Sequence, residues 1–162
     1  MNFKTDITEN EYLRESNYLN NSDINDDVKI EQDKVNRCDA LIFIYPVFWT
    51  EAPAKLVGWF DRVWTYGFAY GDLSIRKMKY IQKSLILCIT GHTIDNLKQY
   101  GHLKSMENVM ISDRLFERVK QSKMHIFDGM TKANEELRNV NWKKHLQKAY
   151  ELGLFINEEK EN

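Results

Sequence analysis

The feature that most constrains the fold of this chain is the alternation of short apolar runs with stretches of helical periodicity. Three runs are short enough to be strands buried inside a sheet. They are Ala40–Tyr45, Ser84–Ile89 and Met124–Phe127. Between the first two lies a stretch with one strongly apolar helix face, made by Leu56, Trp59, Phe60 and Val63. Strands that alternate with helices predict an α/β fold whose parallel sheet is flanked by helices.

The segment before the first strand is expected to be largely irregular. The first 28 residues are polar and show no sustained apolar period, with at most a short helix around Glu9–Ser16. A helix capped by Asp27 is then expected to run to about Arg37. Its inward-facing residues would be Ile30 and Val35.

The ends of the later helices rest on weaker signals. The helix after the first strand is expected to open at Thr50 or Glu51, because Pro53 would then stand in its first turn, where a missing N–H costs little. A further helix-like run contains Met106, Val109, Met110, Leu115, Phe116 and Val119. The last helix is expected from about Thr131 to Leu152. Its inner side would consist of Leu137, Val140, Leu146, Ala149 and Tyr150.

Length and composition narrow the class of protein. A chain of 162 residues predicts one domain spanning residues 1–162, and a net charge of −1 gives no reason to expect nucleic acid as a partner. No apolar run approaches the roughly 20 residues needed to cross a bilayer, so membrane insertion is not expected. Cys38 and Cys88 are isolated, which is typical of reduced thiols, and the predicted location is the cytoplasm.

Common catalytic and nucleotide-binding motifs are absent from the sequence. It contains no G-x-G-x-x-G, no G-x-x-x-x-G-K-[ST] and no G-x-S-x-G. The four histidines are scattered without the spacing of a metal site, so no metal is expected; they are His92, His102, His125 and His145. Arg62 adjoins Asp61 on a helix, where neighbours do not face each other, so it is interpreted as a structural anchor that pairs elsewhere.

Two loops that follow predicted strands offer the best candidate site. Pro46–Thr50 and Thr90–Thr93 would be neighbours if their strands are adjacent in a parallel sheet. The first loop offers aromatic walls, and the second offers hydroxyls and Gly91, which lets a ligand approach the backbone. A flat ring with polar edges, such as a flavin, would fit between them. The aromatic residues of the helix are expected to be core instead: Trp59, Phe60, Val63 and Trp64.

Three segments carry a resemblance to a known family: Tyr45-Pro46-Val47-Phe48-Trp49, the stretch 52–63, and Gly67-Phe68-Ala69-Tyr70. They resemble the NAD(P)H:quinone oxidoreductases, which are flavoproteins. Thr90-Gly91-His92-Thr93 is similar to the second flavin loop of that family, and Met1-Asn2-Phe3 to the segment after its second strand. The resemblance implies a flavodoxin-like three-layer sandwich around a parallel sheet. The sheet would be truncated at its amino-terminal side, with about three strands recognisable.

The same resemblance implies roles for individual residues. The flavin, FAD or FMN, would be bound by Pro46, Val47, Phe48, Trp49, Thr90, Gly91 and His92. Tyr70 and Phe68 would lie at the mouth for the substrate, which family members complete with a partner subunit of a homodimer. Tyr100 and His102 are the candidates for assisting hydride transfer and stabilising charge.

One part of the family pattern has no counterpart in the sequence: the first strand, the phosphate-binding loop, the first helix and the second strand. Because phosphate contacts dominate nucleotide anchoring, we expect this chain by itself to bind flavin weakly. The resemblance implies two-electron transfer from NAD(P)H through flavin to a quinone-type acceptor. The alternative is a truncated, non-catalytic remnant, or a dimerisation or regulatory module of that family.

Overall fold

The structure is a computed structural model that describes residues 24–157, and these residues form two compact units. The first unit contains the described residues up to Cys38 together with Ala54–Tyr80, and the second contains Asp39–Pro53 and the residues from Ile81 onward. The short helix expected around Glu9–Ser16 and the resemblance at Met1–Phe3 lie outside the described residues. The expectation of a single domain stays a prediction.

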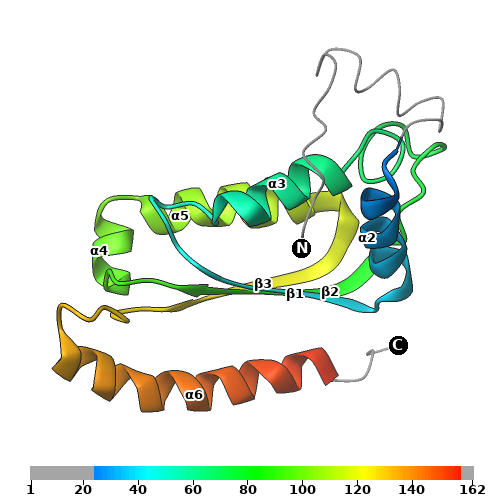
Figure 1. Ribbon diagram of the computed structural model, residues 1–162. Helices are drawn as coiled ribbons and strands as arrows, with labels where there is room; N and C mark the ends of the chain where they lie inside the picture. Colours follow the sequence, from blue (N-terminus) through cyan, green and yellow to red (C-terminus); the bar gives the residue numbers. More distant parts are fainter. Residues whose placement is uncertain (1–23, 158–162) are drawn as a thin grey trace. The chain divides into compact units, whose positions relative to one another are not determined.

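A three-stranded parallel sheet forms the centre of the second unit (Figure 1). Its strands are β1 (Ala40–Pro46), β2 (Ile81–Ile89) and β3 (Val119–Phe127), in the order β1-β2-β3. This sheet confirms the predicted α/β fold and all three predicted strands. Pro46 pairs with Ile89, and Ile89 pairs with Phe127, so the carboxyl ends of the three strands lie at one edge.

The helices of this unit lie on both faces of the sheet. Figure 1 shows α5 (His102–Glu107) on one face and α6 (Glu135–Asn157) on the other. Helix α4 (Ile94–Gln99) precedes α5, and a π-helical segment, η1 (Asn108–Leu115), and a short 3-10 helix, η2 (Phe116–Arg118), follow it. The expected helix-like run therefore ends before Val119, which opens β3, and Phe116 is exposed rather than buried.

Helix α6 packs its buried side on β2 and β3. Leu85, Leu87 and Phe127 form this core. The residues packed against it include Ala149, Leu152 and Ile156 of the helix. Ala149 was expected on the inner side, but three other residues assigned there are exposed, and their assignment was wrong: Val140, Leu146 and Tyr150. The reason is that apolar residues occur on two sides of this helix, and only the side with Ala149, Leu152 and Ile156 meets the sheet.

The first unit is built around α2 (Asp26–Arg37) and α3 (Ala54–Val63). Val35 is buried as predicted, whereas Ile30 is exposed, contrary to the prediction. The buried stripe of α2 is instead Val28, Gln32 and Val35, at spacings of four and three residues. The N-cap position is Asn25, so Asp27 lies in the first turn, where its carboxylate is favourable to the helix dipole.

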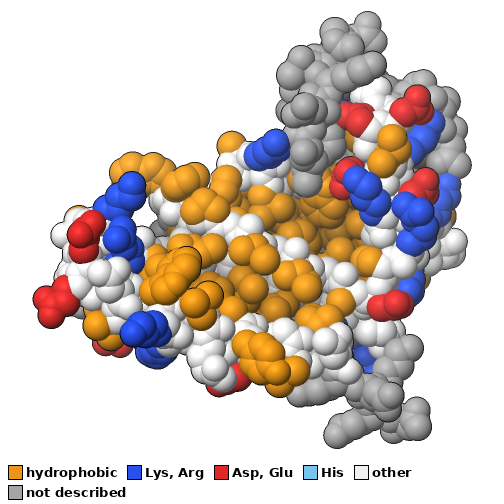
Figure 2. Space-filling view, turned by 60° about the horizontal axis from the view of Figure 1, so that its bottom comes forward, with side chains coloured by type: hydrophobic (Ala, Val, Ile, Leu, Met, Phe, Trp, Pro, Cys, Tyr) orange, Lys and Arg blue, Asp and Glu red, His pale blue; other side chains and the backbone are white. Residues whose placement is uncertain are grey.

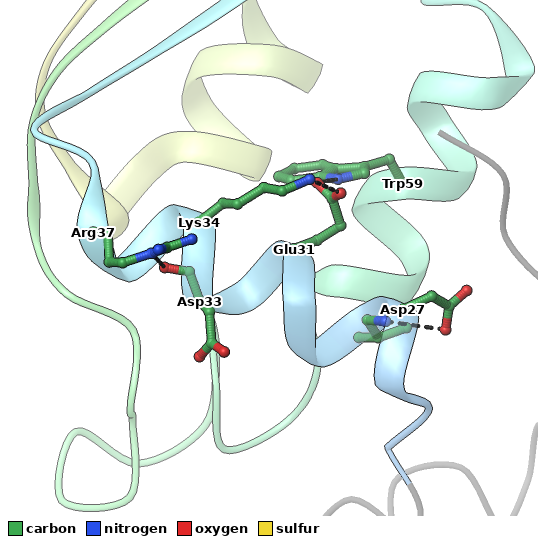
Figure 3. Close-up of polar contacts among 7 residues, drawn as sticks. Asp27, Glu31, Asp33, Lys34, Arg37 and Trp59 are labelled. Carbon is green, nitrogen blue, oxygen red and sulfur yellow. Dashed lines mark hydrogen bonds and ion pairs between the residues drawn. The ribbon is translucent and has the colours of Figure 1, made fainter.

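Polar contacts join α2 to α3 and involve the charged residues of α2. Arg62 of α3 donates to Asp27 at 3.1 Å, which confirms its role as a structural anchor. The Trp59 indole N–H donates to Glu31 at 3.0 Å, and Lys34 pairs with the same carboxylate (Figure 3). Burial opposes ionisation of Glu31, but the hydrogen bonds from Lys34 and Trp59 outweigh it and lower the pKa of this carboxyl.

The aromatic residues of α3 and of the turn after it pack on one another. Trp59 lies 5.3 Å from Phe60 and 4.9 Å from Trp64, measured between ring centroids. Phe60 and Trp64 meet edge to face at 5.3 Å. All three are buried, as is Val63, which confirms that these residues are core.

Candidate functional site at the carboxyl ends of the strands

A tight turn follows β1 where the sequence predicted the opening of a helix. Phe48 and Glu51 exchange two backbone hydrogen bonds, each of 2.9 Å. The two residues between them both have positive φ, 51° at Trp49 and 67° at Thr50. This left-handed conformation is uncommon for residues with a side chain and unusual for a β-branched threonine. The prediction that the helix opens at Thr50 or Glu51 was therefore wrong, since α3 begins only at Ala54.

The turn presents its aromatic side chains to solvent and is held by an ion pair. Trp49 is fully exposed at 100%, and Phe48 is exposed at 56%. Arg114 of η1 donates to the Glu51 carboxylate at 3.1 Å, and the same carboxylate accepts from the Ala52 backbone N–H at 2.7 Å. The arginine side chain is only 14% exposed, so it ties the turn to the body of this unit.

The loop after β2 is fixed to the end of β3 by backbone hydrogen bonds. Thr90 donates to the Phe127 carbonyl at 3.0 Å and accepts from the Met130 N–H at 2.9 Å. The His92 N–H donates to the Thr90 hydroxyl at 3.2 Å. A Cβ on Gly91 would stand 3.3 Å from Cβ of Thr131, which is a close approach. The backbone from Gly91 to His92 is exposed and held in place.

The two predicted loops leave neighbouring strands at the same edge of the sheet. The Val47 N–H donates to the Ile89 carbonyl at 2.8 Å, one residue beyond the paired Pro46 and Ile89. The structure therefore brings Pro46, Val47, Phe48 and Trp49 to the edge at which Thr90, Gly91 and His92 also lie. Their roles in binding stay proposals.

Directly beneath this edge, two buried residues form an inert support. Tyr45 of β1 and Cys88 of β2 are paired in register and joined by a side-chain hydrogen bond. Burial raises the pKa of the Cys88 thiol to about 11, and the hydrogen bond from Tyr45 only partly offsets it. Burial is the main cause that raises the pKa of Tyr45 above its ordinary value, and the nearby Cys88 raises it further. Neither group ionises near neutral pH, so Cys88 is a structural residue and not a nucleophile.

Sequence reasoning missed a third contributor to this edge, the loop after β3. The backbone carbonyl of Asp128 accepts from the Asn141 side chain at 3.1 Å and lies 2.9 Å from Nε2 of His145. The Asp128 carboxylate accepts from the Ile94 N–H at 2.9 Å. Asp128 thus ties together the start of α4 and the buried histidine of α6. Its position directly after the predicted strand Met124–Phe127 was the signal that could have found it.

The candidate catalytic residues lie together at the junction of α4 and α5. The rings of Tyr100 and His102 are 5.9 Å apart and inclined by 34°. Gly101 separates them with φ of 72°, a left-handed value that glycine adopts without strain and that turns the chain between the helices. Both side chains are exposed and open to a solute.

The two residues predicted to contact substrate belong to the first unit. Tyr70 pairs with Tyr66 through the backbone, and their rings meet edge to face at 5.7 Å. Phe68 is only 4% exposed and lies against Trp64, so within this unit its ring packs in the interior. Tyr70 is half-buried and has the better access to a ligand.

Among residues 24–157, no group of three or more His, Cys, Asp and Glu side chains has the arrangement of a metal site. Within the same range, every helix is too short or too polar to cross a membrane.

Comparisons with known proteins agree with this geometry. Residues 2–150 match the family described as the flavodoxin-like fold. A solved NAD(P)H:quinone oxidoreductase from Methanothermobacter marburgensis is 42% identical, with a TM-score of 0.76, over 89% of this chain and 72% of that one. The chain belongs to the NAD(P)H:quinone oxidoreductase family. Its fold is flavodoxin-like.

Two further relatives place this family member in context. An uncharacterised NAD(P)H oxidoreductase from Haemophilus influenzae is 32% identical over 117 residues, which are 69% of this chain and 54% of that protein. The general stress protein 14 from Treponema denticola, solved in complex with FMN, is 20% identical with a TM-score of 0.50 and shares the fold. It is matched over 78% of this chain and 74% of its own. The chain thus spans about half the length of the Haemophilus relative.

Proposed function

We propose that this family member is an NAD(P)H-dependent flavoprotein oxidoreductase that reduces a quinone-type acceptor by two electrons. The observation that carries the proposal is the juxtaposition of the exposed Phe48–Trp49 turn and the Gly91–His92 backbone at one edge of the sheet. Family membership supports it, because the relatives are named for oxidation of NAD(P)H and reduction of quinone.

The residues at this edge fit a flavin ring. Phe48 and Trp49 provide exposed aromatic surface on which a planar ring can stack, and the exposed backbone of Gly91 and His92 offers polar groups to the edge of such a ring. A bound flavin would supply the capacity to accept a hydride from NAD(P)H and to pass two electrons on to the acceptor. FMN and FAD carry the same ring, so these residues would serve either cofactor.

The residues of the chain would orient the reactants and handle protons. The turn after β1 and the loop after β2 hold the ring, while Tyr100 and His102 at the α4–α5 junction are assigned to proton transfer and charge stabilisation. An acceptor quinone takes up two electrons and two protons, so a proton donor beside the acceptor is needed. Tyr70 is assigned to the mouth through which the acceptor enters, and this mouth would be completed by the second subunit of a homodimer. The proposed location of the protein is the cytoplasm.

Flavin titration followed by a turnover assay tests the proposal. FMN and FAD are each added to the purified chain, and NAD(P)H consumption is then followed with a soluble quinone present. Trp49→Ala is expected to weaken flavin binding, and Trp142→Ala, which removes an exposed tryptophan of α6, is the matched control. Equal effects of the two variants on flavin affinity would show that the turn is not part of the flavin site.

The catalytic assignment is tested separately from binding. Tyr100→Phe and His102→Gln are expected to lower turnover by about 10²-fold, the lower end of what a positioned acid or base contributes. Flavin affinity should stay unchanged in both variants, because neither residue is assigned to the ring. Unchanged turnover in both would exclude the pair from catalysis.

A second candidate function is a non-catalytic remnant or a dimerisation or regulatory module of the family. Among residues 24–157, β1 is an edge strand with no partner on its outer side, and an open edge of this kind favours a role in binding another polypeptide. The titration separates the two candidates. A module without redox function would show neither flavin binding at the β1 turn nor quinone-dependent oxidation of NAD(P)H.

A further inference from the structure

The loop after β3 holds the loop after β2 by three backbone hydrogen bonds. Two of them meet at Thr90, whose N–H donates to the Phe127 carbonyl at 3.0 Å and whose carbonyl accepts from the Met130 N–H at 2.9 Å. In the third, the Gly129 N–H donates to the His92 carbonyl at 3.0 Å. The backbone that would meet the polar edge of a ring is therefore fixed from the β3 side.

The side chain of Asp128 extends this hold to α4. Its carboxylate accepts from the N–H of Ile94, the first residue of that helix, at 2.9 Å. The first N–H groups of a helix have no partner within the helix, and a carboxylate there also meets the positive end of the helix dipole. The Thr93 hydroxyl accepts from the Asn96 N–H at 3.4 Å. Asp128 therefore makes the shorter of these two contacts at the start of α4.

Two side chains of α6 hold Asp128 in turn. Its carbonyl accepts from the Asn141 amide at 3.1 Å and lies 2.9 Å from Nε2 of His145. Because a carbonyl can only accept, Nε2 must carry a hydrogen and donate it. The same Nε2 lies 3.6 Å from the Asp128 carboxylate. A Cβ on Gly129 would stand 2.6 Å from Nδ2 of Asn141, so this amide packs directly on the backbone of the loop.

The contacts between α6 and Asp128 are shielded from water. His145 is 7% exposed, and its ring meets the Phe127 ring edge to face at 5.3 Å. Figure 2, which brings the α6 side of the molecule forward, shows hydrophobic side chains gathered on this side. Hydrogen bonds are stronger in such surroundings, and a buried polar group that loses its partner is costly. Asp128 is therefore held in one position.

The start of α4 determines where the candidate catalytic residues lie. The helix has six residues and is about 9 Å long, so Tyr100 follows one short helix after Ile94. Leu97, which is 2% exposed, anchors the helix in the core, and the Tyr100 N–H donates to the Asn96 carbonyl at 3.1 Å. Because these backbone bonds make the helix rigid, a displacement at Ile94 is passed on to Tyr100 and its neighbour His102.

We propose that Asp128 is a positioning residue for the reaction, which holds the α4–α5 junction with Tyr100 and His102 beside the loop after β2. The proposal rests on the proposed function, in which these two residues serve proton transfer and charge stabilisation. Asp128 acts through the backbone of α4 and does not exchange protons with the reactants. Asn141 and His145 keep it in place.

The first test measures kcat and KM with FMN, NAD(P)H and a soluble quinone. Asp128→Ala removes the carboxylate and should lower kcat about tenfold with KM for the quinone nearly unchanged, because a small displacement of a catalytic group can cost up to about 10²-fold. Asp128→Asn keeps an oxygen that can accept from the Ile94 N–H and should recover most of the loss. Asp95→Ala removes an exposed carboxylate from the first turn of the same helix and is the matched control, which should turn over like the wild type.

A second pair of variants acts one step further from α4 and serves in case Asp128→Ala does not fold. His145→Leu removes the donor to the Asp128 carbonyl and should lower kcat in the same direction. His145→Gln keeps a donor at nearly the same place and should turn over like the wild type.

A further readout needs neither flavin nor turnover. Nuclear magnetic resonance on the chain alone follows hydrogen exchange of the Ile94 amide and the contact between the rings of Tyr100 and His102, whose centroids are 5.9 Å apart. Asp128→Ala should speed the exchange and weaken the ring contact. Asp128→Asn and Asp95→Ala should change neither.

A less stable Asp128→Ala with unchanged kcat would overturn the proposal, because a merely structural residue would behave in this way. Equal losses of kcat in Asp128→Ala and Asp95→Ala, or no recovery in Asp128→Asn, would overturn it as well. If the wild type has no turnover, the proposed function fails and the resonance readout still decides the role of Asp128. Slow exchange at Ile94 and an intact ring contact in Asp128→Ala would then overturn that role, and their loss would support it.

Discussion

The aromatic segment from Tyr45 to Tyr70 divides into two regions that treat the same residue types in opposite ways. In α3 and the turn after it, Trp59, Phe60 and Trp64 pack ring on ring and are buried. In the turn after β1, Trp49 and Phe48 project into solvent from a backbone held by hydrogen bonds. A high density of aromatic residues in the sequence therefore does not by itself mark a binding site. The proposed site rests instead on the position of the turn at the carboxyl end of a strand.

Removing one tryptophan from each region tests this difference between the two regions most directly. Trp59→Ala should lower the free energy of unfolding by about 3–5 kcal/mol, because it empties a buried aromatic cluster. Trp49→Ala should change it by less than about 0.5 kcal/mol, because the exposed indole has little packing to lose. Urea unfolding followed by circular dichroism measures both. Similar losses would show that the turn is part of a core.

The ion pair that holds the turn gives the next largest effect. Arg114→Met should destabilise the chain by about 1–3 kcal/mol, because it leaves the Glu51 carboxylate without its charged partner. Arg138→Met removes a partner of the more exposed Glu135 and should cost at most about 1 kcal/mol. A double-mutant cycle with Glu51→Gln isolates the pair. A coupling no larger than that at Glu135 would mean that the turn is held by its backbone alone.

Backbone strain in the same turn predicts a gain in stability. Thr50→Gly should raise the free energy of unfolding by about 0.5–1 kcal/mol, because glycine adopts a φ of 67° without the steric cost borne by threonine. Thr93→Gly is the control, because Thr93 has a φ of −74° and caps α4. It should lower the free energy of unfolding by about a few tenths of a kcal/mol, the usual cost when glycine replaces a capping residue. Thermal unfolding of both variants shows whether each change in stability is a gain or a loss. A loss at Thr50 would show that the threonine side chain contributes contacts that outweigh the strain.

Strands and helix faces could be predicted from the sequence only where the pattern of apolar residues matches the pattern of burial. Ser84–Ile89 was recognisable because β2 is buried on both faces. The first half of β3 was missed because its edge position allows Lys120, Gln121 and Lys123, which hide the strand in the sequence. The sides of α6 were confused because its exposed side carries large apolar residues, such as Trp142, Leu146 and Tyr150, as well as its buried side.

For the candidate site, the strand-end loops could be predicted and the shape of the first could not. Adjacent parallel strands necessarily bring Pro46 and Thr90 to one edge. The positive φ of both Trp49 and Thr50 goes against the local preference of these residues, so only the surrounding contacts select it. The position of Asp128 after a predicted strand could be read from the sequence, but its contact with His145 through a backbone carbonyl leaves no sequence pattern.

The smallest effect concerns the polar contacts of the buried region. Because Glu31 has a lowered pKa in the folded state, its contribution to stability is present above the unfolded value near 4.5 and is lost as pH falls through the folded value. Glu31→Gln should therefore lower stability by about 0.5–1 kcal/mol near pH 7, with the difference shrinking as the pH falls below the ordinary value of 4.5. Asp61→Asn, on the exposed side of α3, is the control for the change in charge. A difference that does not depend on pH would show that shape, not charge, links α2 to α3.

The account rests on the strand-end turn as the surface that meets a flavin ring, and the indole N–H signals in nuclear magnetic resonance test this most directly. FMN is titrated into the isotope-labelled chain, since shifts report even weak binding. The account predicts that the Trp49 indole and the Gly91 and His92 amides shift together, while the buried Trp59 and the exposed Trp142 stay in place. Shifts confined to Trp142, or an unmoved Trp49 while other signals respond, would contradict it.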